Sequence, residues 1–263
     1  MRVLITGAAG DVGSVLRTGL AGRYDVLRLA DIRDCGPTKP GEEVMISDLS
    51  DPAAAARTVE GVDVMIHLAG IREEAPWDPI FKINVVGLVT LFEAARLAGV
   101  KRIVYASSHH AMGYYPASHT VEVDDVPRPD SRYGVSKIFG EALARMYVDK
   151  YGMSVITVRI GALRPLPETP RHLSVWLSPA DMVRLAIASV EAPDVTYRTV
   201  YGVSANTHRR WSTEGADAIG YKPQDNASDY LDRIKDAPAN PFDQFHGGWF
   251  TGMEFVGKPD RLL

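Results

Sequence analysis

Tyr133 and Lys137 form a pair that could move a proton. If Tyr133 opens a helix, Lys137 lies one turn further along the same face. A phenol with a pKa of about 10 is a poor base at neutral pH, but a nearby positive charge favours its ionised form. The spacing therefore favours a tyrosine general base, although an ordinary amphipathic helix with a surface lysine would show the same spacing.

A short apolar run, residues 103–105, precedes two hydroxyl side chains, Ser107 and Ser108. The run is typical of a strand buried on both faces of a parallel sheet. Ligands of open α/β sheets bind outside the carboxyl ends of the strands. We therefore expect Ser108 to lie where a substrate binds.

A second motif, a glycine turn, follows the first predicted strand, residues 3–5, and leads into a helical pattern. Its spacing, Gly-x-x-Gly-x-x-Gly, in the order strand, turn, helix predicts a dinucleotide site. The first glycine permits a tight turn, the second lets the backbone approach a pyrophosphate, and the third allows close helix packing. The predicted contacts are Gly7, Ala9, Gly10, Asp11, Val12 and Gly13.

The acid that ends the second predicted strand selects between two dinucleotides. Asp31 lies 18 residues after Gly13, where a carboxylate accepts hydrogen bonds from the adenosine ribose and repels a 2′-phosphate. We therefore predict NAD rather than NADP, with Ile32 beside it. Arg33 is the alternative signal, because its side chain could stack on adenine or bind a phosphate.

Further cofactor contacts are expected where later strands end. Asp48 and Leu49 follow the third predicted strand, and Asp48 fits either an adenine contact or an ordinary loop carboxylate. The remaining predicted contacts are Leu68, Ala69 and Gly70, which follow the fourth strand, and Asn84, inside a predicted helix over residues 79–98. Asn84 is a poor helix former that we expect to hold a neighbouring loop or bend the helix. His67 lies in an apolar run and is interpreted as a core histidine.

The order of strands and helices predicts an α/β protein with a Rossmann-type, doubly wound parallel sheet. We expect residues 1–160 to form an NAD-binding domain. Residues 161–263 are expected to form a small substrate-side subdomain and tail, integrated with the first. The proline-rich segment 113–130 is long for a loop in a compact domain, which indicates a wall or lid of the site.

Composition narrows the choice of partners. The 263 residues carry a net charge of -4, which argues against nonspecific binding to the phosphate backbone of nucleic acids. A single cysteine allows no internal disulfide, and no apolar run approaches the roughly 18 residues that a membrane helix needs. We expect a cytoplasmic protein that binds neither nucleic acid nor a membrane. No metal site is predicted.

Together, the glycine turn, Asp31, Ser108, Tyr133 and Lys137 resemble the short-chain dehydrogenase/reductase superfamily, in its extended, NAD-dependent epimerase/dehydratase-like branch. Segments 106–116, 133–141 and 200–206 resemble the uronate dehydrogenases, which oxidise the anomeric carbon of glucuronate or galacturonate to a lactone with NAD.

The resemblance implies a role for each matching position. Tyr133 would be the general base, Ser108 would orient the reacting hydroxyl, and Lys137 would bind the nicotinamide ribose and lower the pKa of Tyr133. His110 would line the sugar pocket, and Arg171 would clamp a carboxylate. A planar guanidinium suits that task, because it pairs with a carboxylate through two parallel hydrogen bonds.

Three positions depart from the uronate dehydrogenase pattern at places that would touch the sugar. They are Arg72, His109 and Ala162. Arg72 and Arg164 would also suit a phosphate, so an NAD-dependent aldose or sugar-6-phosphate dehydrogenase is the main alternative. A nucleotide-sugar epimerase and a non-catalytic NAD sensor are further alternatives. The helices expected at 79–98 and 132–150 resemble those that pair between subunits in this superfamily, which favours a homodimer or larger homo-oligomer.

Overall fold

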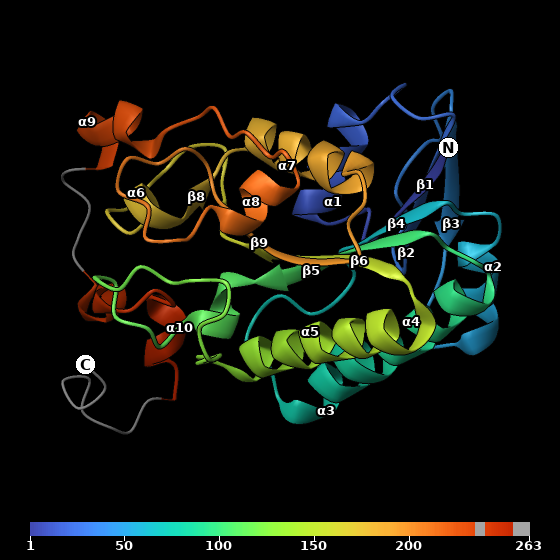
Figure 1. Cartoon of the computed structure of the whole chain (residues 1–263), viewed down its shortest axis with the longest axis horizontal. Helices are drawn as coiled ribbons and strands as arrows, with labels where there is room; N and C mark the ends of the chain where they lie inside the picture. Colours follow the sequence, from blue (N-terminus) through green and yellow to red (C-terminus); the bar gives the residue numbers. More distant parts are fainter. Residues whose placement is uncertain (235–239, 255–263) are drawn as a thin grey trace.

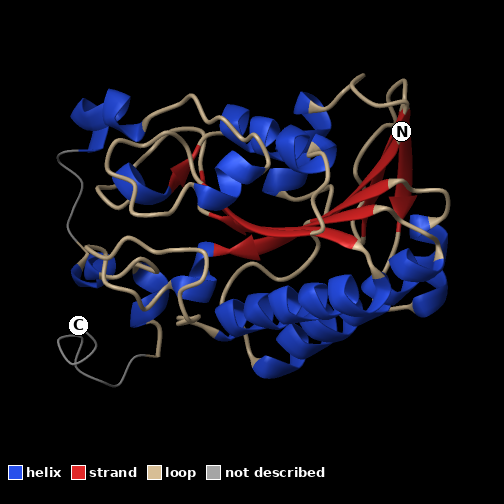
Figure 2. Ribbon diagram, viewed as in Figure 1, coloured by secondary structure: helices blue, strands red, loops and turns tan. Residues whose placement is uncertain are grey.

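A computed structural model describes residues 1–234 and 240–254 of the chain. A seven-stranded sheet with the order β3-β2-β1-β4-β5-β6-β9 forms its centre, and all six neighbouring pairs are parallel (Figure 2). The strands are β1 (Arg2–Thr6), β2 (Val26–Asp31), β3 (Glu42–Ile46), β4 (Val64–His67), β5 (Arg102–Ser108), β6 (Ser154–Ile160) and β9 (Tyr197–Gly202). The predicted doubly wound parallel sheet is confirmed.

Helices cover both faces of the sheet (Figure 1). One layer holds α1 (Asp11–Gly19), α7 (Pro179–Glu191) and α8 (Glu214–Ala218), and the other holds α2 (Pro52–Val59), α4 (Gly87–Leu97) and α5 (Arg132–Tyr151). Both faces of strand β1 are buried. Val3 and Ile5 join the apolar cluster under α1 and α7, and Leu4 joins the cluster under α2 and α4. This two-sided burial explains its continuous apolar sequence.

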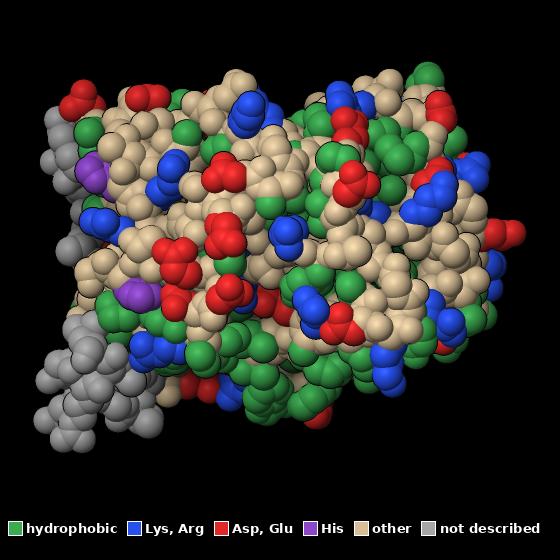
Figure 3. All heavy atoms as spheres, viewed as in Figure 1, with side chains coloured by type: hydrophobic (Ala, Val, Ile, Leu, Met, Phe, Trp, Pro, Cys, Tyr) green, Lys and Arg blue, Asp and Glu red, His purple; other side chains and the backbone are tan. Residues whose placement is uncertain are grey.

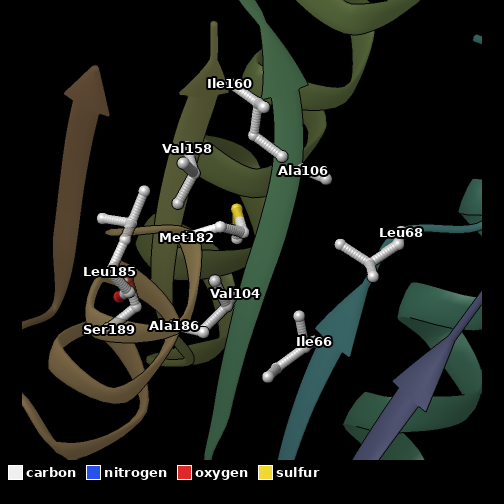
Figure 4. A pocket seen from close by; sticks show the side chains of 10 residues that line it. All are labelled: Ile66, Leu68, Val104, Ala106, Val158, Ile160, Met182, Leu185, Ala186 and Ser189. Atoms are coloured by element: carbon white, nitrogen blue, oxygen red, sulfur yellow. Dashed lines mark hydrogen bonds between the residues drawn. The ribbon is translucent and has the colours of Figure 1, made fainter. Parts of the chain in front are cut away.

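Packing between the sheet and α7 leaves one small apolar void (Figure 4). Its volume is about 10 Å³, and Val104, Val158 and Leu185 are among the side chains that line it. A space of this size holds at most a single water molecule. The void is therefore a packing feature of the core and not a ligand site.

Two long helical stretches lie beside the site, and the second has strong signals at both of its ends. The helix expected at 79–98 is a continuous run of α3 (Trp77–Ile80), the π-helical segment η1 (Phe81–Val86) and α4. Helix α5 begins where the Ser131 hydroxyl accepts a hydrogen bond from the Gly134 amide at 3.0 Å, and it ends at Gly152 with φ +66°. Both are strong end signals, a serine cap and a left-handed glycine.

The chain after residue 160 contributes to the sheet as well as to the site. Helix α7 packs on α1, and β9 pairs with β6, so this region supplies the last strand of the sheet and a helix that covers it. The other elements are η2 (His109–Met112), β7 (Ala162–Leu163), α6 (His172–Val175), β8 (Trp176–Leu177), η3 (Ala227–Tyr230), α9 (Leu231–Ile234), η4 (Pro241–Gln244) and α10 (Trp249–Gly252). Helices α6 and α10 lie beyond the carboxyl end of β5 (Figure 1). Within residues 1–234 and 240–254, no helix is long and apolar enough to span a membrane.

Candidate active site

The glycine turn lies at the switch point of the sheet. Strands β1 and β4 are neighbours there, and the chain leaves them toward opposite sides, β2 and β5. Such a point is where doubly wound sheets bind dinucleotides. Gly7 has φ +70°, and a Cβ added to it would lie 2.7 Å from the Ala69 amide nitrogen, so the turns after β1 and β4 approach each other closely.

The start of α1 is suited to an anion. Gly10 is its N-cap and provides no side-chain hydrogen bond, so the first amides of α1 lack a side-chain cap. A Cβ at Gly13 would overlap the Gly7 carbonyl, which explains the close approach of the helix to the turn. Free amides and the helix dipole favour a phosphate here, so these residues fit a dinucleotide.

Asp31 lies at the end of β2, next to this turn. Its Oδ2 accepts a hydrogen bond from the Ala9 amide at 3.0 Å, and its Oδ1 accepts one from the Arg33 amide at 2.9 Å. The Arg33 side chain is exposed and only loosely paired with the carboxylate, at 3.4 Å. The neighbouring Ile32 is 67% exposed. The acid is therefore fixed at the edge where an adenosine ribose would lie.

Asp48 and Asn84 organise the loops at this edge. Asp48 Oδ1 accepts hydrogen bonds from the amide and the hydroxyl of Ser50, and these bonds lower the pKa of Asp48. Asn84 accepts from the Ile71 amide at 2.8 Å and donates to the Ile71 carbonyl and the Ser136 hydroxyl. The expectation that Asn84 holds a neighbouring loop is confirmed. His67 is a buried core histidine bonded to Thr6, as interpreted from the sequence.

Ser108, Tyr133 and Lys137 come together where β5 ends and α5 begins. All three are buried, at 4%, 7% and 6% exposure. The Lys137 ammonium donates to the Ala106 carbonyl at 2.8 Å and lies 5.5 Å from the centre of the Tyr133 ring. The Ser108 hydroxyl hydrogen-bonds with the Tyr133 phenol. The helical placement of Tyr133 and Lys137 is the one that the spacing predicted.

The pKa of Tyr133 is raised, whereas the resemblance implied that Lys137 would lower it. Burial raises the pKa of Tyr133 to about 12, against the opposing effects of the Ser108 hydrogen bond and the Arg72 charge. Burial also lowers the pKa of Lys137 to about 8, while Glu141 acts to raise it. Burial outweighs charge here because both groups lie almost entirely out of water.

The Arg171 guanidinium is already engaged by the protein. Its Nε and Nη2 donate to the His246 carbonyl at 3.0 and 2.7 Å, and Nη2 also donates to His109 Nε2 at 2.6 Å. His109 can accept because its Nδ1 donates to the Ile160 carbonyl, 2.9 Å away. Burial lowers the pKa of Arg171 to about 10. The two-bond carboxylate clamp is therefore not preformed, and Nη1 is the nitrogen without a recorded partner among residues 1–234 and 240–254.

His110 is held from three sides. Its Nδ1 lies 2.7 Å from Asp130 Oδ2, the Phe250 ring stacks on it at 3.9 Å, and the Tyr133 ring lies edge-on at 5.9 Å. Its amide donates to the Ser108 hydroxyl at 3.2 Å. His110 thus lies beside the tyrosine and the serine, and its place in the wall of a sugar pocket stays a prediction.

Arg72 and Ala162 have protein partners that the sequence did not indicate. Arg72 is exposed and forms an ion pair with Asp11, and its charge still reaches Tyr133. Ala162 pairs with Trp176 in a two-stranded sheet and packs against the apolar cluster that contains Trp211. Arg72 is therefore an exposed residue near Tyr133, Ala162 is part of a packed sheet, and contact of either with a sugar stays a prediction.

The loop 113–130 is tied to distant parts of the chain. Val121 donates to the Arg210 carbonyl at 2.8 Å, and the amides of His246 and Gly247 donate to the carbonyls of Tyr115 and Gly113. These bonds join backbone groups, so the order of side chains in the sequence does not predict them. These bonds fix the loop to the C-terminal region, while its role as a wall or lid of the site stays a prediction.

A buried ion pair behind Ser108 was missed by sequence reasoning. Arg159 pairs with both carboxylate oxygens of Glu141, at 3.0 and 2.8 Å, and also donates to the Tyr201 hydroxyl. Ser107 donates to the same carboxylate at 2.5 Å. The one charged residue of the largely buried strand β6 was the available signal, because a buried charge needs a partner. Among the described residues, no group of three or more His, Cys, Asp or Glu could hold a metal ion.

The sheet order, the glycine turn at the switch point and the buried Ser-Tyr-Lys cluster define a Rossmann-type protein with a dinucleotide site. Residues 3–164 match the NAD dependent epimerase/dehydratase family, and the chain belongs to that family. It is 40% identical to the uronate dehydrogenase of Pseudomonas syringae pv. tomato over 98% of this chain and 94% of that protein. It is also 38% identical to the NAD-dependent glucose-6-phosphate dehydrogenase of Haloferax volcanii, over 87% of this chain and 95% of that protein.

Solved structures agree with this placement. The uronate dehydrogenase from Agrobacterium tumefaciens, in a point variant complexed with NAD, superposes with a TM-score of 0.92. It is 43% identical and covers 95% of this chain and 97% of its own. The similarity therefore extends beyond residues 1–160 to most of the chain.

Proposed function

We propose that this protein is an NAD-dependent dehydrogenase that oxidises the anomeric carbon of a sugar acid of the glucuronate or galacturonate type to a lactone. The observation that carries the proposal is the buried cluster of Ser108, Tyr133 and Lys137 beside the glycine turn. The uronate dehydrogenases among the relatives support the choice of substrate.

In the proposed reaction, Tyr133 removes the proton of the anomeric hydroxyl while the hydrogen on the same carbon leaves as hydride. NAD, when bound, supplies the hydride acceptor. The substrate loses two hydrogens and becomes a lactone, so the electrons balance. Ser108 orients the reacting hydroxyl, and Lys137 would hold the nicotinamide ribose beside Tyr133. The buried position of all three groups excludes water from the step.

The substrate end of the site depends on Arg171. In our proposal its Nη1 donates to the carboxylate of the sugar acid, and the bonds to His246 and His109 hold the guanidinium in place. Arg164, which is exposed, acts on the pKa of Arg171 through its charge. A second positive charge near Arg171 favours the alternative of a sugar phosphate, a substrate class that the glucose-6-phosphate dehydrogenase of Haloferax volcanii represents.

One experiment tests the proposal and its alternatives. NADH formation is measured side by side with glucuronate, galacturonate, glucose, arabinose and glucose 6-phosphate. We expect the two uronates to give the highest kcat/KM. Preference for glucose 6-phosphate or a neutral aldose would overturn the sugar-acid assignment, and the absence of net NADH with every sugar would favour an epimerase or an NAD sensor.

We also propose that the protein forms a homodimer or larger homo-oligomer through α4 and α5. Large apolar side chains are exposed along both helices, and apolar atoms gather where the lower helices reach the surface in Figure 3. They include Ile83, Val86 and Val89 before and within α4, and Val135, Phe139 and Met146 on α5. Exposed apolar patches of this kind mark protein interaction sites.

Sedimentation of the wild type and of Phe139→Glu tests the oligomer. We expect a dimer or larger species for the wild type and a shift toward monomer for the variant, because a charge in an apolar interface is costly. A wild type that sediments as a monomer would contradict the proposal. The cytoplasmic location remains a proposal, which cell fractionation would test.

A further inference from the structure

Asp130 is a buried acid that the proposed reaction does not use. Its side chain is 0% exposed, and its Oδ2 lies 2.7 Å from His110 Nδ1. Its Oδ1 accepts a hydrogen bond from the Ser131 hydroxyl at 2.8 Å. A carboxyl group kept out of water beside a histidine needs a reason, because its burial is costly.

The surroundings hold the pair rigidly. A Cβ at either Gly113 or Gly247 would overlap Asp130 Oδ2, so two backbone segments enclose the carboxylate. The His110 ring lies between the rings of Phe250, at 3.9 Å, and His109, at 4.0 Å. The imidazole therefore has one orientation relative to the acid.

One nitrogen of His110 is committed and the other is open. A neutral imidazole has one N–H donor and one bare acceptor nitrogen. A carboxylate at Nδ1 can only accept, so it places the hydrogen on Nδ1 and leaves Nε2 bare. Within residues 1–234 and 240–254, no partner is recorded for Nε2, and the ring lies beside Tyr133 and Ser108.

Building on the function proposed above, we propose that Asp130 is a positioning residue that fixes the tautomer of His110, so that Nε2 accepts a hydrogen bond from a hydroxyl group of the sugar. The tautomer decides which way this hydrogen bond runs. With the hydrogen on Nε2 instead, the same ring would present a donor and would meet the sugar hydroxyl in a different orientation.

Proton uptake by Asp130 would reverse the direction of this bond. Burial raises the pKa of Asp130 to about 7 and lowers the pKa of His110 well below its usual value, so the ring stays neutral. Above pH 7 the carboxylate accepts from Nδ1. Below it, the carboxylic acid donates to Nδ1 and the ring hydrogen lies on Nε2. We therefore expect kcat/KM to rise with pH through about 7.

The other titratable groups around the pair do not account for this step. Arg171 acts to lower the pKa of both His110 and Asp130, and remains charged throughout. Burial raises the pKa of both Tyr114 and Tyr133, so neither pKa coincides with the step expected for Asp130. Burial lowers the pKa of His109 well below its usual value, which keeps that ring neutral as well.

The kinetic test compares Asp130→Asn with Asp125→Asn, a matched control in which a partly exposed acid of the same loop loses its ion pair with His119. We expect Asp130→Asn to reduce kcat/KM by about 10- to 100-fold above pH 7. Losses of this size are typical when a residue that orients a ligand-binding histidine is replaced. The inflection near pH 7 should disappear, while NAD affinity is unchanged. Asp125→Asn should keep the wild-type profile. A folded Asp130→Asn that keeps the inflection would overturn the proposal.

A second measurement needs neither turnover nor a folded Asp130 variant. The ¹⁵N shifts of the imidazole nitrogens in wild-type protein report which nitrogen carries the hydrogen, and comparison with His110→Gln assigns them. We expect His110 to carry it on Nδ1 above pH 8. A hydrogen on Nε2 at that pH would overturn the proposal, even if no sugar in the panel is oxidised and the proposed function fails.

Discussion

Arg171 Nη2 donates a hydrogen bond to His109 Nε2 at 2.6 Å, so two neighbouring side chains of the substrate end are bonded to each other. Nε and Nη2 of the same guanidinium also donate to the His246 carbonyl. A carboxylate can therefore meet only Nη1 unless His109 moves. The departure at position 109 thus changes how many hydrogen bonds the arginine can offer.

Removing this guanidinium tests its role. Arg171→Ala should raise the KM for glucuronate by about 10- to 100-fold, the effect of losing one charge-assisted hydrogen bond. The KM for glucose, which lacks the carboxylate, should change far less. Initial rates with both sugars measure the difference, with Arg164→Ala as the exposed control. An equal rise for both sugars would show that Arg171 does not bind the carboxylate.

Tyr133→Phe should abolish almost all turnover. The variant keeps the ring and loses the hydroxyl, so a general-base contribution of about 100- to 10,000-fold should disappear from kcat. NAD affinity, followed by fluorescence titration, should stay close to that of the wild type. Tyr151→Phe removes the hydroxyl of an exposed tyrosine on the same helix and should leave both values unchanged. Full activity in Tyr133→Phe would end the general-base assignment.

Asp31→Ala should reduce the preference for NAD over NADP. The carboxylate at the end of β2 would otherwise accept bonds from the ribose and repel a 2′-phosphate, so NAD should lose about 10- to 100-fold in affinity relative to NADP. Dissociation constants for both cofactors test this. Asp34→Ala, in the loop that follows, is the control. An unchanged ratio would argue against contact between Asp31 and the ribose.

Arg159→Met should destabilise the fold strongly. It would leave Glu141 as a buried carboxylate without its ion-pair partner, at a cost of about 3 to 5 kcal/mol in the free energy of unfolding. The double variant Arg159→Met with Glu141→Leu should recover part of this loss. Urea denaturation measures both, and Arg145→Met, which breaks an exposed pair with Asp149, should have little effect. A loss no larger than that of the control would contradict the prediction.

The sequence was sufficient for features that depend on neighbours in the chain. The apolar run at residues 3–5, the glycine turn and the Tyr133 helix follow from strand burial, the space around glycine and the repeat of the α-helix. The doubly wound sheet followed from the order of these elements. Asn84 was also interpreted correctly as a loop-holding residue, because a poor helix former inside a helix needs a reason.

Only the tertiary structure determined which groups meet across the site. Asp130 reaches His110 from 20 residues away, and a backbone carbonyl at His246 occupies the guanidinium of Arg171 from 75 residues away. Neither contact joins residues that are close in the sequence, and every residue has a backbone carbonyl. No sequence pattern therefore predicts these contacts. The pKa of Tyr133 also depends on burial, which outweighs the nearby charges. The sequence by itself determined the placement of Tyr133 and Lys137 on one helix and the form of the glycine turn, which rest on local geometry, while long-range packing decided which groups are buried and which hydrogen bonds they make.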